Sequence, residues 1–575
     1  MEHPEFDEVL LPGDALRNAA AELLQGRLGK AYLEYRANGK KADIYFVERH
    51  FGKISKTYVE AKDYKKCLGR DDVVKIWADY SGIIAKNAPA ILLVVTRNGL
   101  TSDAQSYIED EQPLMRHQTI REIENETLGL SEYVAYLGDE FSRDGLDKYY
   151  VNAQAFQVHY GSDKERSVSS EKIDIFSELL YSTNQSDRGP VAILGGYGAG
   201  KSSLARRIAS YFACKSKHDF ESRKPILIKL GLFTRYSSIE GLLGAMFTSD
   251  FPVPSFNFRI FENLNRSGRF IIILDGFDEM KHAMSWSDFR NQVKDLNRLI
   301  VGDAKVILLG RPSAFISFEE HIHVLKGVKR VGDGWRKEVD WPDFEEFELS
   351  NFDHYESIDF VERYLSFRIS LVEGRPQDSE NERKSRRINE VKSIMVRDHD
   401  LFGKPVHLKI LCDLAADDSI DLVRFEESLT RWDLYEVFFN DLLERDSEKV
   451  ARRELGPQAR LTFLRELAYW LWTERGGQIS FSADELPRSL IEQLNPREDE
   501  DADGLMRELL VGAFLEKKGG TISTLATGRL QNFWLLRESY FHLLLAERFR
   551  YIRELQRTGC VPFWKNTKML RNLRP

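Results

Sequence analysis

The clearest chemical signal in this sequence of 575 residues is a glycine-rich run with the GxxxxGK(S/T) spacing of a phosphate-binding loop. The residues of this loop and the serine that follows it are Gly195, Gly196, Tyr197, Gly198, Ala199, Gly200, Lys201, Ser202 and Ser203. Glycines let successive backbone N–H groups point inward, and a helix that follows presents its positive end to the phosphates. Lys201 is expected to reach the β- and γ-phosphates, and Ser202 to coordinate Mg²⁺. A glycine-rich turn with an incidental lysine is the alternative.

A second apolar run, FIIILD, ends in Asp275 and is followed by two further acids, Asp278 and Glu279. A parallel sheet presents ligand-binding groups at the carboxyl ends of its strands, so Asp275 is expected to hold Mg²⁺ from the second coordination shell or through a water molecule. Asp278 and Glu279 lie close enough in the chain to polarise the water that attacks the γ-phosphate. A solvated acidic turn after a buried strand would have the same sequence.

Near the N-terminus, sixteen residues separate Asp43 from Glu60-Ala61-Lys62. Glu60 and Lys62 lie two residues apart and share one face of a strand, and a two-stranded hairpin would bring Asp43 beside Glu60. Paired carboxylates bind hard divalent cations, so Asp43 and Glu60 are candidate metal ligands. Lys62 would orient or activate a water and stabilise the charged phosphate in metal-assisted hydrolysis. A cross-strand Glu–Lys pair on an ordinary surface is the alternative.

Basic residues surround this group and offer contacts to nucleic-acid phosphates, although solvated turns would look the same. The net charge of the whole chain is −9, so any nucleic-acid contact requires a local basic patch. The flanking cations are Arg36, Lys40, Lys41, Lys53, Lys56, Lys65 and Lys66.

The elements that must position these residues follow from the hydrophobic pattern and the turn residues. In the N-terminal part we expect a helix over 14–28, strands over 42–47 and 57–61 joined by a turn at 50–54, a helix over 71–86, a buried strand over 90–95 and a helix from 103. This order defines a small domain that ends near residue 150. The polar, Ser-rich stretch 159–170 is the expected linker.

The central part alternates strand and helix, as a parallel sheet requires. Its expected strands are 191–195, 225–230, 270–275 and 305–310. Beyond residue 350 amphipathic helical segments dominate, interrupted at 513–524 by a hairpin-like segment with a Gly-Gly turn. The predicted fold class is a multidomain protein in which α/β domains precede helical ones.

The run LDGFDE at 274–279 resembles the extended Walker B motif of NACHT-type STAND ATPases. The run KVILLG before Arg311 and Pro312 is similar to the sensor motif of that family, which implies that Arg311 contacts the γ-phosphate; a solvated charge is the alternative. The resemblance also implies a helical domain, with Pro405 near the adenine unless it simply begins a helix, and a winged-helix ending. Further similar segments are 347–353, 403–415, 434–443, 464–472 and 532–549.

The last similar segment departs from the family in one position. The family often places a histidine there that touches the ADP phosphate and locks the resting state, whereas this chain has Arg537, with His542 further along. An arginine pairs well with a phosphate, so Arg537 is a candidate nucleotide contact. An arginine that merely flanks the core is the alternative.

The motif of Asp43 with Glu60-Ala61-Lys62 looks like that of the PD-(D/E)xK nucleases, specifically the Mrr-like restriction endonucleases. The helix and strand expected after Lys62 fit the order of that fold, and Glu22 matches an acid that such families often place on the preceding helix. The leading proline is missing, because Lys41-Ala42 precede the aspartate. The resemblance implies Mg²⁺-dependent cleavage of DNA by the catalytic residues Asp43, Glu60, Lys62 and Glu22.

Composition places the chain among ordinary globular proteins, with 42% hydrophobic and 30% charged residues. Its four cysteines are scattered without a metal-ligand spacing, which favours reduced thiols. The acidic N-terminus lacks the pattern of a signal peptide, and no apolar stretch reaches the roughly 20 residues that span a bilayer. A cytoplasmic protein without membrane contacts is therefore expected.

These interpretations divide the chain into five parts: a PD-(D/E)xK nuclease-like αβ domain at 1–155, a linker with a helix at 156–186, a NACHT P-loop NTPase domain at 187–345, a helical domain at 346–456, and a winged-helix domain with a short tail at 457–575. The two resemblances jointly imply an antiviral switch. A protein trigger, viral or from the host, would open the ADP-bound chain, ATP and Mg²⁺ would bind, and the resulting homo-oligomer would cut DNA. The alternatives are an adaptor that only binds DNA or protein, and an ATP-driven restriction translocase.

Overall fold

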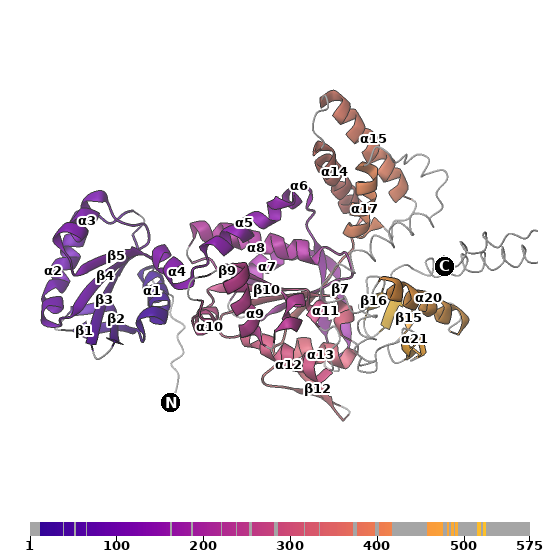
Figure 1. Ribbon diagram of the computed structural model, residues 1–575. Coiled ribbons are helices and arrows are strands. Elements are labelled where there is room, and N and C mark those ends of the chain that lie inside the picture. The colour runs from indigo at the N-terminus through magenta and orange to yellow at the C-terminus, as the bar shows by residue number, and fades with distance from the viewer. Residues whose placement is uncertain are drawn as a thin grey trace, which may run out of the picture. The chain divides into compact units, whose positions relative to one another are not determined.

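The computed structural model describes residues 12–416, with gaps of one to five residues, and further along the segments 457–474, 480–481, 485–487, 489–492, 515–518 and 521–524. The chain forms two compact units, one of residues 1–314 and 319–417 and the other of residues 315–318 and 418–575. Figure 1 labels the helices and strands of both.

The N-terminal sheet has five strands in the order β1-β2-β3-β4-β5. They are β1 (Tyr32–Ala37), β2 (Lys40–His50), β3 (Lys53–Lys62), β4 (Ala90–Thr96) and β5 (Met115–Thr119). The first three strands pair antiparallel, and β4 and β5 run parallel to β3. The predicted hairpin is confirmed as β2–β3, and β1 and β5 are additional strands.

Helices cover both faces of this sheet (Figure 1). α1 (Pro12–Leu28) lies on one side, and α2 (Arg70–Lys86) lies with α3 (Ser102–Ser106) on the other. On the α2 side, alternate strand residues pack against the apolar stripe of the helix, and Tyr45, Tyr58, Tyr80 and Val94 are buried there. The strand period of two therefore decides which residues face α2.

Three helices follow this sheet: α4 (Ile120–Leu128), α5 (Ser131–Arg143) and α6 (Leu146–Tyr149). Glu124 of α4 is buried and forms ion pairs with Lys224 at 2.6 Å and Arg269 at 3.1 Å. On α5, the Tyr133 hydroxyl accepts a hydrogen bond from the Leu227 N–H at 2.9 Å and donates one to the Leu227 carbonyl at 3.3 Å. These contacts tie the connecting helices to an edge of the next sheet.

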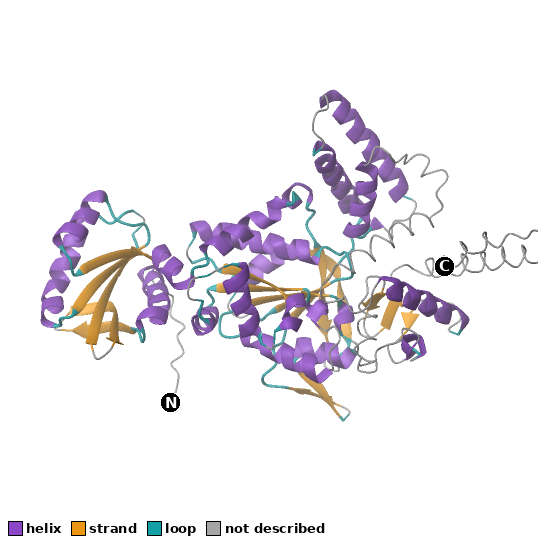
Figure 2. Ribbon diagram, viewed as in Figure 1, coloured by secondary structure: helices purple, strands orange, loops and turns teal. Residues whose placement is uncertain are grey.

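The central sheet has seven strands in the order β7-β6-β14-β8-β11-β10-β9. Five of them are parallel: β14 (Glu345–Leu349), β8 (Val191–Leu194), β11 (Lys305–Gly310), β10 (Phe270–Asp275) and β9 (Lys224–Lys229). The four strands predicted here are confirmed, and β14 is a fifth. Helices lie on both sides of this sheet (Figure 2), as a parallel sheet buried on both faces requires.

The stretch 159–170 is not the linker that its polar composition predicts. It belongs to a hairpin of β6 (Gln154–Tyr160) and β7 (Arg166–Asp174), and β6 pairs antiparallel with β14. β7 is an edge strand whose side chains are largely exposed, so serines and charged residues are tolerated there. The central sheet therefore begins near residue 154, and the helix that follows is α7 (Ile175–Thr183).

The remaining described elements up to residue 416 are mostly helices. Beyond residue 350 this agrees with the predicted helical segments. The principal elements are α8 (Lys201–His218), α9 (Ile239–Ala245), α10 (Phe258–Arg266), α11 (Phe277–Met280), α12 (Trp286–Leu296), α13 (Phe318–Lys326), the hairpin β12 (Val328–Val331) and β13 (Gly334–Lys337), α14 (His354–Ser370), α15 (Gln377–Met395) and α17 (Pro405–Ala416).

In the second unit, α20 (Pro457–Thr473) and α21 (Ser489–Glu492) accompany a small antiparallel sheet. Its strands are β15 (Ser480–Phe481), β17 (Thr521–Thr524) and β16 (Leu515–Lys518), in that order. The predicted hairpin within 513–524 is confirmed as β16–β17. The segments 434–443 and 532–549 lie outside the described residues, and the winged-helix domain stays a prediction.

Candidate functional site

The glycine-rich loop lies between β8 and α8, with Gly200 at the N-cap of the helix. Gly198 has a φ of 70°, and its carbonyl accepts a hydrogen bond from the Val406 N–H at 3.3 Å. A Cβ at position 198 would lie 2.0 Å from the Val406 side chain, so only glycine fits both the left-handed backbone and this contact. The expected order of strand, loop and helix is confirmed, and α8 begins at the loop.

Lys201 lies against the carbonyls of the same loop. Its Nζ donates hydrogen bonds to Gly195 O at 2.7 Å and to Gly196 O at 2.9 Å. These bonds hold the ammonium beside the start of α8, where backbone N–H groups have no partner within the helix. The loop therefore presents both a fixed cation and a helix N-terminus, the two groups that recognise phosphates.

Asp275 ends β10, and its carboxylate accepts a hydrogen bond from the Ser202 hydroxyl. β11 lies between β10 and β8 in the sheet, so the first turn of α8 reaches across one strand to make this contact. Burial raises the pKa of Asp275, and the neighbouring carboxylates of Glu279 and Asp278 add to the rise. A hydroxyl beside a carboxylate is a donor set that suits Mg²⁺, which takes oxygen ligands and keeps several waters.

Asp278 and Arg311 form a buried ion pair where β10 and β11 end. Asp278 is 2% exposed and Arg311 is 4% exposed. One carboxylate oxygen of Asp278 accepts a hydrogen bond from the Arg311 backbone N–H at 3.2 Å, and the other lies 3.0 Å from Arg311 Nε. The guanidinium also lies over the Tyr197 ring, 4.7 Å from its centroid. The predicted sensor arginine therefore touches the P-loop itself.

Asp278 and Glu279, the two acids expected to polarise water, differ in their contacts. Both oxygens of Asp278 contact Arg311, so in this conformation Asp278 holds the arginine. Glu279 directs its carboxylate toward Gly231, where an added Cβ would lie 2.7 Å from Oε2. The role of either acid in orienting a water stays a prediction.

The two remaining predicted nucleotide contacts have different outcomes. Pro405 is the first residue of α17, and the next residue, Val406, contacts Gly198 of the loop. The structure thus places the Pro405 segment beside the P-loop, and its contact with adenine stays a prediction. Arg537 and His542 lie outside the described residues.

Asp43, Glu60 and Lys62 come together on the α2 side of the N-terminal sheet. The register pairs Ile44 with Val59, which sets Asp43 opposite Glu60 one step along the strands. Asp43 Oδ2 accepts a hydrogen bond from the Ala61 N–H at 2.8 Å, and Lys62 Nζ lies 2.6 Å from Glu60 Oε1.

The electrostatics of this group reflect partial burial and mutual contact. Burial and the nearby Glu60 carboxylate raise the pKa of Asp43, although the Ala61 N–H opposes them. Burial alone would lower the pKa of Lys62, but the bond to Glu60 and the charge of Asp43 raise it overall. Lys62 is thus a cation near neutral pH, suited to stabilising negative charge, and a poor general base.

Tyr80 belongs to the same group, and the spacing of the motif did not reveal it. Its hydroxyl donates a hydrogen bond from α2 to Glu60 Oε2 at 2.6 Å, and the residue is fully buried. Burial and the adjacent Glu60 carboxylate raise the pKa of Tyr80, which keeps the hydroxyl a donor. The sequence feature that could have indicated Tyr80 is its position on the apolar stripe of α2, between Ile76 and Ile83, because a buried tyrosine hydroxyl needs a hydrogen-bond partner.

Glu22 does not join this group. Its pKa is raised by burial, and the side chains that act on it are Arg269, Ser267 and Asp303 of the central domain. The charges that act on Asp43 come from Glu60, Lys62 and Arg17 instead. Arg17 and Glu22 both belong to α1, but only Arg17 acts on Asp43, whereas the neighbours of Glu22 lie in the central domain, so the sequence-based grouping of Glu22 with the metal ligands is not what the structure shows.

Several flanking cations have partners within the chain, which reduces their availability to phosphates. The observed pairs are Lys40 with Asp79 at 2.6 Å, Lys41 with Glu34 at 2.8 Å, and Lys56 with Asn87 at 3.2 Å.

Asp43 and Glu60 are the two carboxylates of this group that could bind a metal ion. Among the described residues, no group of three or more His, Cys, Asp and Glu side chains is placed to hold a metal ion. A pair such as Asp43 and Glu60 nevertheless fits Mg²⁺, which is usually bound by one or two carboxylates and completes its shell with water and substrate oxygens. The described residues also include no helix long and apolar enough to cross a membrane.

Comparison with known proteins finds distant similarities. No protein-family model matches the chain. An uncharacterised WD repeat-containing protein of Nostoc sp. is 25% identical over 234 residues, which are 39% of this chain and only 15% of that relative. The chain therefore spans a small part of this relative's length.

Three solved structures illustrate the structural similarities. A Walker-type ATPase of Pyrococcus abyssi has a TM-score of 0.35 at 16% identity and covers 62% of this chain and 94% of its own. The Aeropyrum pernix ORC1 protein in complex with DNA has a TM-score of 0.31 at 15% identity, covering 64% and 92%. A STAND protein of Pyrococcus horikoshii with a tetratricopeptide repeat sensor has a TM-score of 0.20 at 16% identity, covering 69% and 48%. At such low scores the assignment of a nucleotide site rests on the residues described above.

Proposed function

We propose that this chain is a nucleotide-dependent switch of the STAND type, which binds and hydrolyses ATP and thereby controls a metal-dependent DNA nuclease in its N-terminal domain. The observation that carries the first half is the arrangement around the P-loop. Lys201 lies on the loop carbonyls, Ser202 bonds to Asp275, and Arg311 packs on Tyr197. A phosphate chain and an Mg²⁺ ion would each have binding groups there, and Arg311 would be close enough to sense the nucleotide.

The residues of the chain account for binding and sensing. The α8 N-terminus and Lys201 would bind the phosphates, and Ser202 with Asp275 would hold Mg²⁺. When bound, Mg²⁺ would neutralise part of the negative charge on the phosphate oxygens. Arg311 already has a carboxylate partner in Asp278, so a γ-phosphate that recruits it would compete for the same guanidinium. A ligand shifts a two-state equilibrium only through such differential contacts.

The second half of the proposal is supported by Asp43, Glu60 and Lys62 lying together on one face. The two carboxylates would hold a divalent cation, which activates water and neutralises the phosphodiester. Lys62 would stabilise the negative charge that develops on the phosphate. In this proposal a protein trigger, viral or from the host, favours the ATP-bound state, whose oligomers bring nuclease domains together in antiviral defence.

The test uses the full-length protein with and without Lys201→Ala and Glu60→Ala. Calorimetry with ATP and ADP should show nucleotide binding that Lys201→Ala abolishes and Glu60→Ala leaves intact. Plasmid DNA incubated with the protein, ATP and Mg²⁺, with and without lysate of infected cells, should be cut by the wild type alone. Equal nucleotide binding by wild type and Lys201→Ala would refute the switch. Cleavage that survives Glu60→Ala would refute the nuclease site.

One observation favours a second candidate function, an adaptor that binds DNA or protein without cutting. Each oxygen of Glu60 has a partner in the chain, Lys62 on one side and Tyr80 on the other. A carboxylate held in this way is also a stable structural element. The adaptor is distinguished by DNA binding in Mg²⁺ without any cleavage after triggering.

A further inference from the structure

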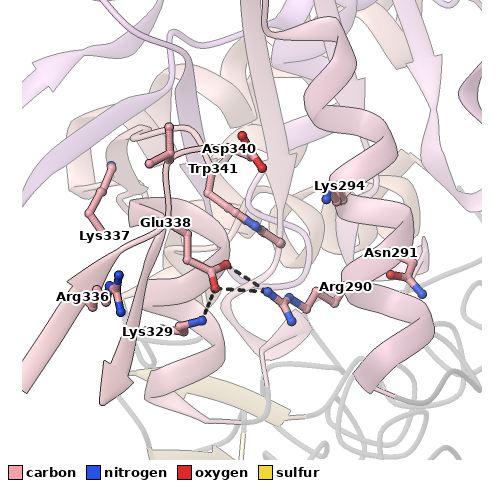
Figure 3. A pocket seen from close by; sticks show the side chains of 10 residues that line it. Arg290, Asn291, Lys294, Lys329, Arg336, Lys337, Glu338, Asp340 and Trp341 are labelled. Atoms are coloured by element: carbon pink, nitrogen blue, oxygen red, sulfur yellow. Dashed lines mark hydrogen bonds and ion pairs between the residues drawn. The ribbon is translucent and has the colours of Figure 1, made fainter. Parts of the chain in front are cut away.

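A cavity in the central domain carries chemistry that the proposed switch does not use. Its volume is about 530 Å³, and Figure 3 shows it between α12 and the β12–β13 hairpin with the segment that follows. No residue that lines it belongs to the P-loop or to the N-terminal group. It is therefore a separate site, of the volume typical for small-molecule ligands.

The lining of this cavity is strongly basic in a chain whose net charge is −9. Five cations face two carboxylates, Glu338 and Asp340. The cations come from the helix and from the hairpin, on opposite sides of the cavity in Figure 3. They are Arg290 and Lys294 on α12, Lys329 on β12, and Arg336 and Lys337 on β13.

Glu338 organises one wall of the cavity. Its carboxylate lies 2.6 Å from Lys329 Nζ and 3.0 Å from Arg290 Nη2, and it also contacts His323 at 2.9 Å. Hydrogen bonds from Lys329 and His323 lower the pKa of Glu338 to about 2, so the carboxylate stays ionised. The Glu338 carboxylate therefore holds the hairpin against α12. Both of its oxygens are already paired with these side chains, so it does not neutralise the other cations of the cavity.

Two cations of the cavity are not neutralised. Among the described residues, neither the Lys294 ammonium nor the Arg336 guanidinium has a hydrogen-bonding or ion-pair partner, although both line the same cavity. Both side chains are exposed, so water screens their mutual repulsion, and an anion that binds them displaces no ion pair. A multiply charged anion would meet a cation on each wall of the cavity.

The aromatic residue of the cavity helps to define the ligand class. Trp341 is only 5% exposed, and its ring packs against His323 with the centroids 4.3 Å apart. Its faces are therefore covered, and it offers little surface on which a nucleic-acid base stacks. Recognition must come from the lysine and arginine side chains, whose preferred partners are phosphate oxygens.

We propose that this cavity binds a compact, multiply charged phosphate ligand at a site separate from the P-loop. Lys294 and Arg336 grip the phosphates from opposite sides, and Glu338 keeps the walls in place. The concave shape favours a compact ligand over an extended nucleic-acid backbone, and the covered tryptophan leaves no face on which a base would stack. Occupation of the cavity joins α12 to the hairpin and stiffens this side of the central domain.

The test measures binding of inorganic pyrophosphate to the full-length protein by calorimetry in saturating ADP and Mg²⁺. Lys294→Ala combined with Arg336→Ala should weaken binding at least tenfold, since it removes two charge-assisted contacts to the phosphates. The matched control removes one exposed lysine and one exposed arginine elsewhere in the same domain, Lys215→Ala with Arg259→Ala, and should bind as the wild type does. Lys201→Ala should retain pyrophosphate binding, which separates the cavity from the P-loop.

Two further measurements complete the test. Glu338→Gln weakens the ion pairs that hold the hairpin against α12 and should weaken pyrophosphate binding by several-fold. A fluorescent single-stranded oligonucleotide, followed by anisotropy, should bind equally to wild type and to the Lys294–Arg336 double variant. The proposal is overturned if pyrophosphate does not bind in the presence of ADP, or if the double variant binds it as tightly as the control does. It is also overturned if only oligonucleotide binding depends on the two cations.

Discussion

The nucleotide site and the N-terminal site differ in how their charges are satisfied. At the nucleotide site, the Asp278 and Arg311 side chains are 3% and 5% exposed and pair with each other. At the N-terminal site, the Glu60 and Lys62 side chains are 14% and 29% exposed. A buried pair must exchange one partner for another to respond to a ligand, because an unpaired buried charge is costly. A half-exposed pair can respond to solvent, metal or substrate with little change in the fold.

This difference suits a switch joined to a simple catalyst. In the proposed switch the buried site would have two discrete arrangements, because Arg311 would pair either with Asp278 or with a phosphate. The exposed site needs no second arrangement, and access to it can be regulated from outside. The comparison therefore predicts large effects of substitution on stability at the nucleotide site and small ones at the N-terminal site.

The largest expected effect is that of Arg311→Ala. The substitution leaves the Asp278 carboxylate buried without its partner, and the free energy of unfolding of the central domain should fall by about 3–5 kcal/mol. Arg259→Ala, at an exposed arginine, is the control. Urea unfolding followed by tryptophan fluorescence measures the loss. A loss as small as that of the control would remove the contrast between the two sites.

Acid should act strongly on the central sheet through Glu346 of β14. The residue is 1% exposed, and although burial alone raises its pKa, His321, Tyr160 and Arg166 lower it to about 2. Because the folded-state value lies below the usual 4.5, the stabilisation is present at pH above 5 and is lost as pH falls toward 2. A shift of this size corresponds to about 3 kcal/mol. Thermal unfolding of wild type and Glu346→Gln between pH 7 and pH 3 measures it, and the variant should be less stable at neutral pH and change less with acid.

Gly198→Ala should have an intermediate effect. The left-handed backbone alone costs about 1–2 kcal/mol for a residue with a Cβ, and the contact with Val406 must also open. Gly244→Ala is a matched control, because an added Cβ there meets nothing within 4 Å. Thermal unfolding and ADP binding should both be weakened in Gly198→Ala alone. Unchanged ADP affinity would show that the loop tolerates displacement of α17.

The smallest expected effect is that of Tyr80→Phe in the N-terminal sheet. It removes one hydrogen bond to a partly exposed carboxylate and should cost about 1 kcal/mol of stability. Tyr58→Phe, in the same core, is the control. Hydrogen exchange of the β3 amides measures the change. A loss as large as that of Arg311→Ala would place the two sites in one class and break the comparison.

The sequence predicted best what a continuous stretch of chain encodes. The P-loop, its flanking strand and helix, and the four buried strands could be recognised from the sequence. A short apolar run that is bounded by turns and alternates with helices has few alternatives to a buried parallel strand. The β2–β3 hairpin was predictable for the same reason. Strand β14 was missed because its sequence, EEFEL, alternates acids with apolar residues and resembles an exposed strand.

What depends on tertiary contacts was not predictable. The polar β7 was mistaken for a linker because an edge strand tolerates the same residues as a loop. Tyr80 was missed because it lies twenty positions from Glu60 on another element. The partner of Asp278 could not be foreseen, since Arg311 follows β11, 33 positions along the chain.

The hydroxyl of Tyr133 has a consequence for any shortened form of this protein. β9 is the last strand of its sheet, and Leu227 turns its N–H and carbonyl outward to that hydroxyl. Removing α5 together with the N-terminal domain would uncover this edge, and bare strand edges recruit other chains. Preparations of the central domain alone should therefore aggregate unless the truncation begins before residue 131.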